Sequence, residues 1–201
     1  MTVWQDLKSR GRSYALFFLA ILLVSILAHL LLIANGLTNT YDGLWEGGYY
    51  RNYAWVLGIG RWFWPFIGYG RLHISPEPFT SFTTLILFSL GACLAVDLFK
   101  EIGTLKGCAA ALFLTVNTAV CSSLSYRYMS PTFGIAFFLS VAAAWCLDKW
   151  RRYGWIPAAA CVTLALGAYQ SDLGCTCLLV LFLLICMISD GESVKKLRNL
   201  R

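Results

Sequence analysis

Six apolar runs constrain the fold of this chain more than any other feature of its sequence. A membrane-spanning helix needs about 20 mostly apolar residues, within a range of roughly 17 to 25. The last two runs are short, and only Ser171 and Asp172 separate them, which is typical of a tight helical hairpin. The sequence therefore predicts an all-α membrane helix bundle, a single transmembrane domain over 1–201 with about six spans, at 14–34, 79–99, 107–124, 131–147, 155–170 and 173–189.

The composition excludes the main soluble alternatives. Hydrophobic residues make up 59% of the chain and charged residues 13%, whereas soluble domains carry about 25% charged residues. A disordered chain needs low hydrophobicity, and a nucleic-acid binder needs basic residues along one exposed face, so we expect no nucleic-acid partner. The first run is too long for the apolar core of a signal peptide, and residues 37–39 lack a small-residue cleavage site. We therefore expect it to be retained as a helix.

The net charge of +6 is an orientation signal. Twelve of the 16 Lys and Arg residues, but only six of the ten Asp and Glu residues, fall on one side of the six-span layout. Because Lys and Arg collect in cytoplasmic loops, this count places the tails 1–13 and 190–201 in the cytoplasm and the long connection 35–78 outside. The whole positive excess then lies inside, and no anionic partner is needed to explain it. The four outer basic residues are all arginines: Arg51, Arg61, Arg71 and Arg127.

The eight cysteines do not predict a disulfide framework or a metal site. All of them fall in or at the ends of predicted spans, where cysteine behaves as a small apolar residue. Cys175 and Cys177 are separated by one residue and lack the spacing and the histidine partners of a zinc site. We therefore expect neither a metal nor another cofactor.

The outer connection 35–78 is the candidate functional segment. A long connection in a tight bundle is usually functional or disordered, and this one is too aromatic for disorder, with eleven Tyr, Trp and Phe residues between 41 and 69. Tyr and Trp prefer the level of the lipid headgroups. The composition predicts one or two juxtamembrane amphipathic helices over 52–69, broken around Pro65, that form the floor of an outward-facing pocket.

Two acids near the start of this connection are candidates for a general base. Asp42 and Glu46 are four residues apart, so in a helix both carboxylates share one face, where their repulsion raises the pKa of one of them. A carboxyl group with a raised pKa suits proton abstraction. The alternative is an Asp that caps a helix N-terminus beside a solvated Glu.

Two arginines and a hairpin complete the candidate site. Arg61 and Arg71 present planar guanidinium groups that suit a phosphate at headgroup depth, or they extend to lipid phosphates without a specific ligand. The hairpin residues Tyr169, Gln170 and Asp172 either line a pocket or solvate a loop. His29, an ionisable residue inside the first span, is either a hydrogen-bonding residue between helices or part of a site.

The order of three short motifs resembles a known family. Tyr41-Asp42, Gly60-Arg61-Trp62 and Gly167-Ala168-Tyr169-Gln170 follow one another on the predicted outer side. This arrangement resembles the bacterial membrane glucosyltransferases that decorate O-antigen and related surface polysaccharides, the serotype-converting family with a GT-C fold. Members of that family are considerably longer, so the resemblance implies an N-terminal portion or a short member.

The resemblance implies a multi-pass enzyme of the bacterial cytoplasmic membrane whose active site faces outward. It would transfer a hexose, typically glucose, from a polyprenyl-phosphate carrier to a cell-surface polysaccharide or lipid-linked glycan by a single inverting displacement. Asp42 would be the general base and Glu46 a second carboxylate. Arg61 and Arg71 would bind the donor phosphate, and the substrate pocket would contain Tyr41, Trp62, Tyr169, Gln170 and Asp172, the last of these from its placement alone.

The implied partners are the lipid-linked donor, the glycan acceptor, the bilayer, a lipid-linked sugar flippase and the transferase that loads the carrier. The alternative is a non-catalytic membrane component of the same export system, such as a flippase or an assembly subunit. A small-solute transporter would usually show broken helices in mid-membrane and paired repeats, and the sequence shows neither.

Overall fold

The chain forms a bundle of long helices with two short helices across one end. The computed structural model describes residues 3–39, 54–150 and 152–189, with side chains from residue 11 onward. Every regular element in these ranges is a helix, which confirms the predicted all-α class. The elements are α1 (Val3–Ala34), α2 (Ala54–Gly58), α3 (Trp64–Gly70), α4 (Phe79–Leu98), α5 (Leu105–Thr115), α6 (Thr118–Ser125), α7 (Ser130–Lys149), α8 (Trp155–Ala168), the 3-10 turn Gln170–Asp172 and α9 (Leu173–Ser189).

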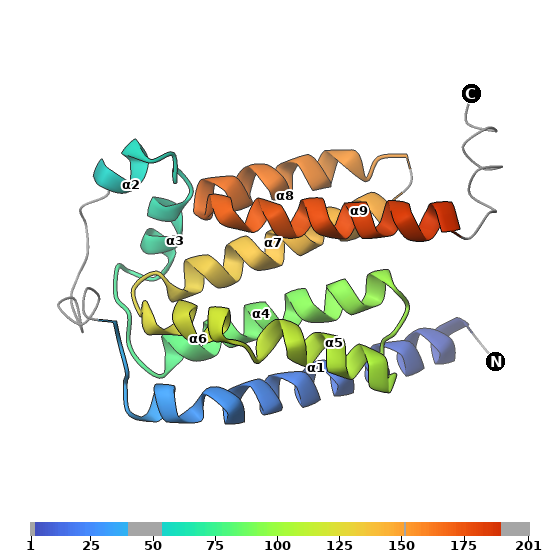
Figure 1. Ribbon diagram of the computed structural model, residues 1–201, viewed down its shortest axis with the longest axis horizontal. Helices are drawn as coiled ribbons and strands as arrows, with labels where there is room; N and C mark the ends of the chain where they lie inside the picture. The colour runs from blue at the N-terminus through green and yellow to red at the C-terminus, as the bar shows by residue number, and fades with distance from the viewer. Residues whose placement is uncertain (1–2, 40–53, 151, 190–201) are drawn as a thin grey trace.

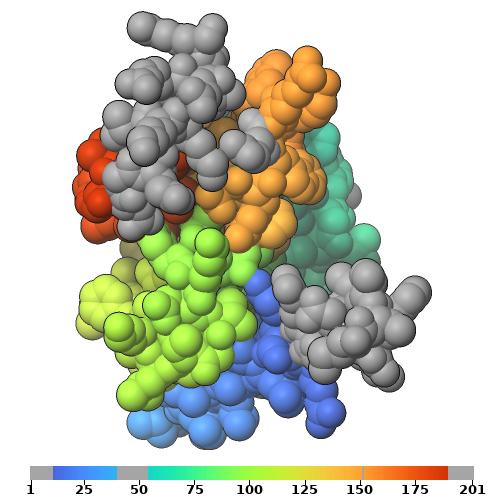
Figure 2. Space-filling view, turned by 90° about the vertical axis from the view of Figure 1, so that its right-hand side faces the viewer, coloured from blue at the N-terminus to red at the C-terminus, as the bar shows by residue number. Residues whose placement is uncertain are grey.

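The long helices lie side by side, and α2 and α3 lie at one end of them (Figure 1). The described start of α1 and end of α9 lie at the opposite end. Figure 2 faces that opposite end and shows α8 and α9 above α1 and α5. In the rest of the text, the end that carries α2 and α3 is called the cap end. The side of the membrane on which it lies stays a prediction from the charge count.

Five segments are long and apolar enough to cross a membrane: Gly11–Ala34, Phe79–Leu98, Leu105–Ser125, Ser130–Lys149 and Gln170–Ser189. The remaining predicted span, 155–170, corresponds to α8, which has 14 residues. At 1.5 Å per residue α8 reaches only about 21 Å, less than the hydrocarbon thickness of about 30 Å. It packs against α7 along its length. Some of its apolar residues therefore contact the bundle, and the others face the surroundings.

The centre of the bundle is the contact between α4 and α7. The rings of Phe88 and Phe137 stack with their centroids 4.9 Å apart. A Cβ on Gly134 would come within 3.0 Å of the Leu87 Cβ, so the glycine allows the two backbones to approach closely. A hydrogen bond of 2.7 Å between Thr84 Oγ1 and Ser130 Oγ joins the same helices. In contrast, α9 is almost wholly exposed, as expected for a helix that faces lipid.

The third predicted span is broken, which the sequence analysis did not expect. Helix α5 ends at Thr115 and α6 begins at Thr118, with Val116 outside the helical conformation and Asn117 extended. Asn117 Oδ1 accepts the Val120 N–H at 3.0 Å and caps α6. The Nε2 of His29 on α1 donates to the Thr115 carbonyl at 3.0 Å. A backbone group without a hydrogen bond is costly in apolar surroundings. The buried His29 therefore provides a hydrogen bond to one of the backbone groups that the break leaves without a helical partner.

The connection before α4 forms two short helices, but their break differs from the expected one. The interruption falls between Gly58 and Trp64, and Pro65 lies in the first turn of α3. Proline is tolerated there because the first N–H groups of a helix have no partner within it. The expectation of a break around Pro65 was therefore wrong, since this proline helps to begin a helix.

A buried carboxylate ties three helices together at the end opposite the cap. Asp97 on α4 accepts hydrogen bonds from the Tyr14 hydroxyl on α1 and from Trp145 Nε1 on α7 at 2.7 Å. Lys149 Nζ lies 3.3 Å from the same carboxylate. These partners satisfy the buried charge, so Asp97 has a structural role.

Replacing Asp97 by Ala is expected to destabilise the bundle by roughly 3 kcal/mol, because it leaves Lys149 and two hydrogen-bond donors without their buried partner. The measurement is denaturation of the purified protein in mixed detergent micelles. Asp148→Ala is the matched control: its carboxylate lies 3.7 Å from the same lysine but is more exposed, so its loss should cost less than about 1 kcal/mol. Equal effects of the two changes would contradict the structural role of Asp97.

Candidate functional site

The cap end is held together by a contact between two of the motifs singled out in the sequence. Residues 54–70, which contain α2 and α3 and are called the surface segment from here on, pack on the end of α8. The Phe63 N–H donates to the Gly167 carbonyl at 2.8 Å. Gln170 Nε2 donates to the Ile59 carbonyl at 2.7 Å. Gly60-Arg61-Trp62 and Gly167-Ala168-Tyr169-Gln170 are therefore neighbours in space, although they lie more than a hundred residues apart.

Two glycines make this contact possible. Gly60 has a φ of +83°, a conformation that side chains disfavour, and the Gln170 amide lies beside it. A Cβ on Gly167 would come within 2.6 Å of the Trp62 ring and 2.9 Å of the Phe63 Cβ. The surface segment can lie close to α8 only because position 167 has no side chain.

Arg61 lies against the aromatic side chains of this contact. Its guanidinium carbon is 4.5 Å from the centroid of the Tyr169 ring and 5.9 Å from that of Trp64. Its Nε is buried and has no hydrogen-bond partner. Burial lowers the pKa of the Arg61 guanidinium, and the neighbouring Tyr169 opposes that shift. Among the described carboxylates none forms an ion pair with it. Arg61 is thus a partly desolvated cation that aromatic faces hold in position.

Tyr169 connects Arg61 with a cavity of about 120 Å³. Its ring meets the Phe133 ring edge-on, with centroids 4.7 Å apart. The cavity also contacts the half-buried Asp172 and residues of α6, just beyond the break in the third span. Its lining residues are Phe88, Ser122, Ser123, Tyr126, Phe133, Tyr169 and Asp172. The cavity therefore offers hydroxyl groups and one carboxylate, and Tyr169 links it to the guanidinium.

Arg71 lies in the same aromatic cluster. Its Nη2 donates to the Tyr128 carbonyl at 2.8 Å, and its guanidinium carbon is 5.5 Å from the Tyr128 ring. The Tyr128 ring in turn lies 5.7 Å from the Trp64 ring, which Arg61 also contacts. The structure therefore brings both predicted phosphate-binding arginines to one pair of rings, with Arg61 nearer to the cavity.

Three predicted site residues, Tyr41, Asp42 and Glu46, lie outside the described residues. The last described residue before them is Asn39, whose N–H donates to the Ser125 carbonyl at 3.1 Å. Ser125 ends α6 and adjoins Tyr126, which lines the small cavity. Among the described residues, no group of three His, Cys, Asp or Glu side chains gathers as metal ligands would.

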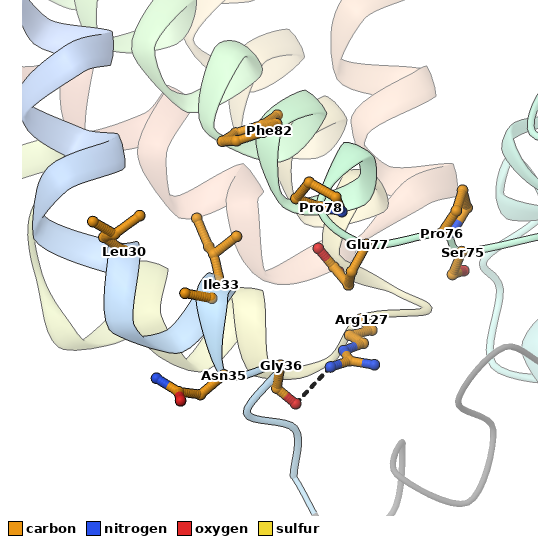
Figure 3. A pocket seen from close by; sticks show the side chains of 11 residues that line it. Leu30, Ile33, Asn35, Gly36, Ser75, Pro76, Glu77, Pro78, Phe82 and Arg127 are labelled. Carbon is orange, nitrogen blue, oxygen red and sulfur yellow. Dashed lines mark hydrogen bonds between the residues drawn. The ribbon is translucent and has the colours of Figure 1, made fainter.

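The sequence analysis missed a second and larger cavity, of about 750 Å³, between the end of α1 and the start of α4 (Figure 3). Glu77 and Arg127 are its charged lining residues. Glu77 precedes Pro78 at the start of an apolar run, a position at which an acid often only stabilises a helix N-terminus. That ordinary explanation hid the residue, and no other signal in the sequence marks it.

The comparisons with known proteins give one match. A family model described as Glucosyl transferase GtrII matches residues 41–201, about four fifths of the chain. The matched region contains the surface segment, the break between α5 and α6, and the hairpin. No curated protein and no solved structure matches the chain.

Adding a methyl group to Gly167 is expected to loosen the surface segment. Gly167→Ala places a Cβ against Trp62 and Phe63, which weakens the backbone bond to Phe63. Loss of about one such bond should raise the opening of residues 54–70 about tenfold, measured by amide hydrogen exchange. Gly174→Ala is the matched control, because a Cβ there meets nothing within 4 Å. Unchanged exchange in Gly167→Ala would show that the close contact does not hold the segment.

Proposed function

The chain belongs to the GtrII glucosyl transferase family, and on that premise we propose that it transfers a glucosyl unit from a polyprenyl-phosphate carrier to a surface polysaccharide or lipid-linked glycan. The reaction takes place at the cap end, which the charge count predicts to face the outside. A lipid-linked donor is consistent with the apolar helices next to this end and with its tryptophan and tyrosine side chains, which prefer the level of the lipid headgroups.

The environment of Arg61 carries this proposal. When the sugar leaves its carrier, negative charge develops on the phosphate, and a fixed cation in a partly dry site stabilises it. Arg61 has that character: it is partly desolvated, Tyr169 and Trp64 hold it, and its buried Nε lacks a protein partner. The guanidinium group matches the planar arrangement of phosphate oxygens. Arg71 adds positive charge to the same cluster and fixes Tyr128 through its carbonyl.

The small cavity is the proposed place of the transferred sugar. Its volume of about 120 Å³ is below the range of about 300 to 1,000 Å³ that is usual for whole ligands. It therefore receives only an edge of the sugar, with Asp172 and the serines of α6 as partners for hydroxyl groups. Trp62 and Gln170 support this arrangement indirectly, because they dock the surface segment on α8.

The proposed chemistry is a single displacement with inversion. An acceptor hydroxyl oxygen attacks the anomeric carbon while the bond from that carbon to the carrier phosphate oxygen breaks. Asp42 takes the hydroxyl proton, and the phosphate leaves with the bonding electrons toward Arg61. Glu46 orients the acceptor or assists Asp42. Asp42 follows Asn39 by three residues, which span at most about 11 Å, so the proposal requires the reacting carbon to lie near the end of α6.

Loss of the Arg61 guanidinium is expected to impair use of the lipid-linked donor. Arg61→Ala should lower kcat/KM for polyprenyl-phosphate glucose by about ten- to a hundredfold, because it removes a hydrogen bond to a charged group. Arg61→Lys should lower it less. The measurement is transfer of labelled glucose by the protein in lipid nanodiscs. Arg152→Ala is the matched control, because Arg152 also lies over a tyrosine ring, 5.5 Å from Tyr153, outside the cap end. Equal kinetics of Arg61→Ala and wild type would remove Arg61 from the site.

Asp42→Asn is expected to reduce transfer by about a hundredfold or more, since a positioned general base contributes about 10² to 10⁴ in rate. Binding of the carrier should persist, because the change leaves Arg61 in place. The assay compares single-turnover transfer with retention of labelled polyprenyl phosphate, and Glu46→Gln gives the effect of the neighbouring carboxylate. Normal transfer by Asp42→Asn would exclude it as the base. Movement of labelled lipid across vesicles without any transfer would favour a flippase.

A further inference from the structure

The cavity between α1 and α4 has the size of a ligand site and contains hydrogen-bonding groups that the protein leaves unused. Its volume of about 750 Å³ lies within the usual range of ligand pockets. Figure 3 shows Leu30 and Ile33 of α1 facing Phe82 and Glu77 of the α4 side across it, with Arg127 nearby. The proposed reaction at Arg61 makes no use of this space.

Glu77 has one occupied and one unoccupied carboxylate oxygen. Its Oε2 accepts the Ser81 N–H at 3.4 Å, at the start of α4. Its Oε1 is buried and has no hydrogen-bond partner, and the same is true of Ser75 Oγ, two residues earlier on the same wall. A buried polar atom without a partner loses the hydrogen bonds that it makes in water, and this loss is larger when the atom is charged. The hydrogen bond to the start of α4 gives Oε2 a structural role, but Oε1 has no such role.

Arg127 fixes the opposite wall. Its Nη2 donates to the Gly36 carbonyl at 2.5 Å (Figure 3). Gly36 has a φ of +57°, and a Cβ there would overlap the guanidinium group. The end of α1 and the turn after α6 are therefore locked to each other, and the cavity is formed before any ligand arrives, which reduces the entropy cost of binding.

The chemistry of the lining favours a neutral, hydroxyl-rich ligand. The Glu77 carboxylate and the Ser75 hydroxyl offer an acceptor and a donor, Glu77 and Arg127 carry opposite charges, and Phe82, Ile33 and Pro78 supply apolar surface. A bare phosphate is a poor fit, because the Glu77 carboxylate opposes any attraction by Arg127. A sugar ring presents hydroxyl groups at its edge and C–H groups on its face, which fits this mixed lining.

We propose that this cavity binds a sugar unit of the acceptor glycan, with Glu77 Oε1 and Ser75 Oγ as partners of its hydroxyl groups. The assignment to the acceptor rests on the proposed glucosyl transfer, whereas the binding of a sugar does not. The two cavities lie on either side of one turn, because Tyr126 lines the smaller cavity and Arg127 the larger. A chain that enters the larger cavity would therefore lie next to the proposed donor site.

The test measures sugar binding separately from transfer. The full chain in nanodiscs is titrated with the methyl pyranosides of glucose, galactose, mannose and rhamnose and observed by saturation-transfer NMR. At least one pyranoside should bind, and Glu77→Gln should weaken that binding about tenfold, the difference between a charged and a neutral acceptor. Ser75→Ala should weaken it about threefold to fivefold. Glu101→Gln is the matched control, because Glu101 accepts a hydrogen bond from Thr104 away from both cavities.

Several outcomes would overturn the proposal. If none of the pyranosides binds, the cavity holds only water. Equal binding by wild type and Glu77→Gln would exclude Glu77 as a partner of the sugar. Displacement of the pyranoside by equimolar inorganic phosphate would show that the cavity is not selective for a neutral ligand. If Glu77→Gln does not fold, a second variant tests the proposal. Ala34→Trp leaves residue 77 unchanged and places a large side chain in the cavity, so it should abolish binding. If the protein shows no glucosyl transfer but binds sugar in a way that depends on Glu77, the sugar site is supported and the proposed transferase function is rejected. If transfer is normal but sugar binding does not depend on Glu77, the transferase function is supported and the sugar site is rejected.

Discussion

Every polar group of the backbone must find a partner where the surroundings are apolar, and the rest of this structure depends on how that requirement is met. Within the long helices the backbone meets it alone. Where a helix stops, another element supplies the partner: His29 bonds the last carbonyl of α5, Gln170 bonds Ile59, and Gly167 bonds Phe63. These long-range bonds tie the helix ends together. The interruptions at α6, α8 and the surface segment therefore converge on one end of the bundle, and the two cavities lie there.

The convergence leaves cavities at the cap end, whereas the described centre of the bundle is filled. At the centre, Gly134 and the rings of Phe88 and Phe137 fill the space between α4 and α7. At the cap end two cavities remain between the elements, and their linings include polar residues such as the serines of α6 and Glu77 before α4.

The sequence was sufficient for what depends on hydropathy and insufficient for what depends on single contacts. The apolar runs predicted the all-α class, and the order of the motifs indicated the glucosyltransferase family. The contact between Gly60-Arg61-Trp62 and the hairpin could not be predicted, because it requires the missing side chain of Gly167 and two hydrogen bonds to backbone carbonyls, one from a backbone N–H and one from the Gln170 side chain. The break at Val116 was missed because no proline or glycine marks it, and its stabilising partner, His29, lies 86 residues away. Glu77 was missed because an acid before a helix already has an ordinary role.

The charged side chains at the two ends of the bundle have different contacts, and this difference distinguishes a structural role from a proposed functional one. At the end opposite the cap, Asp97 neutralises Lys149 inside the fold, and such a pair is complete without a ligand. At the cap end Arg61 rests on the Tyr169 ring, while Arg71 and Arg127 donate to the backbone carbonyls of Tyr128 and Gly36. Among the described carboxylates none forms an ion pair with Arg61, and an aromatic ring fixes the position of a cation without cancelling its charge. A fixed cation of this kind stabilises an anion without reorganisation, and the proposed transfer from a phosphate carrier requires this property.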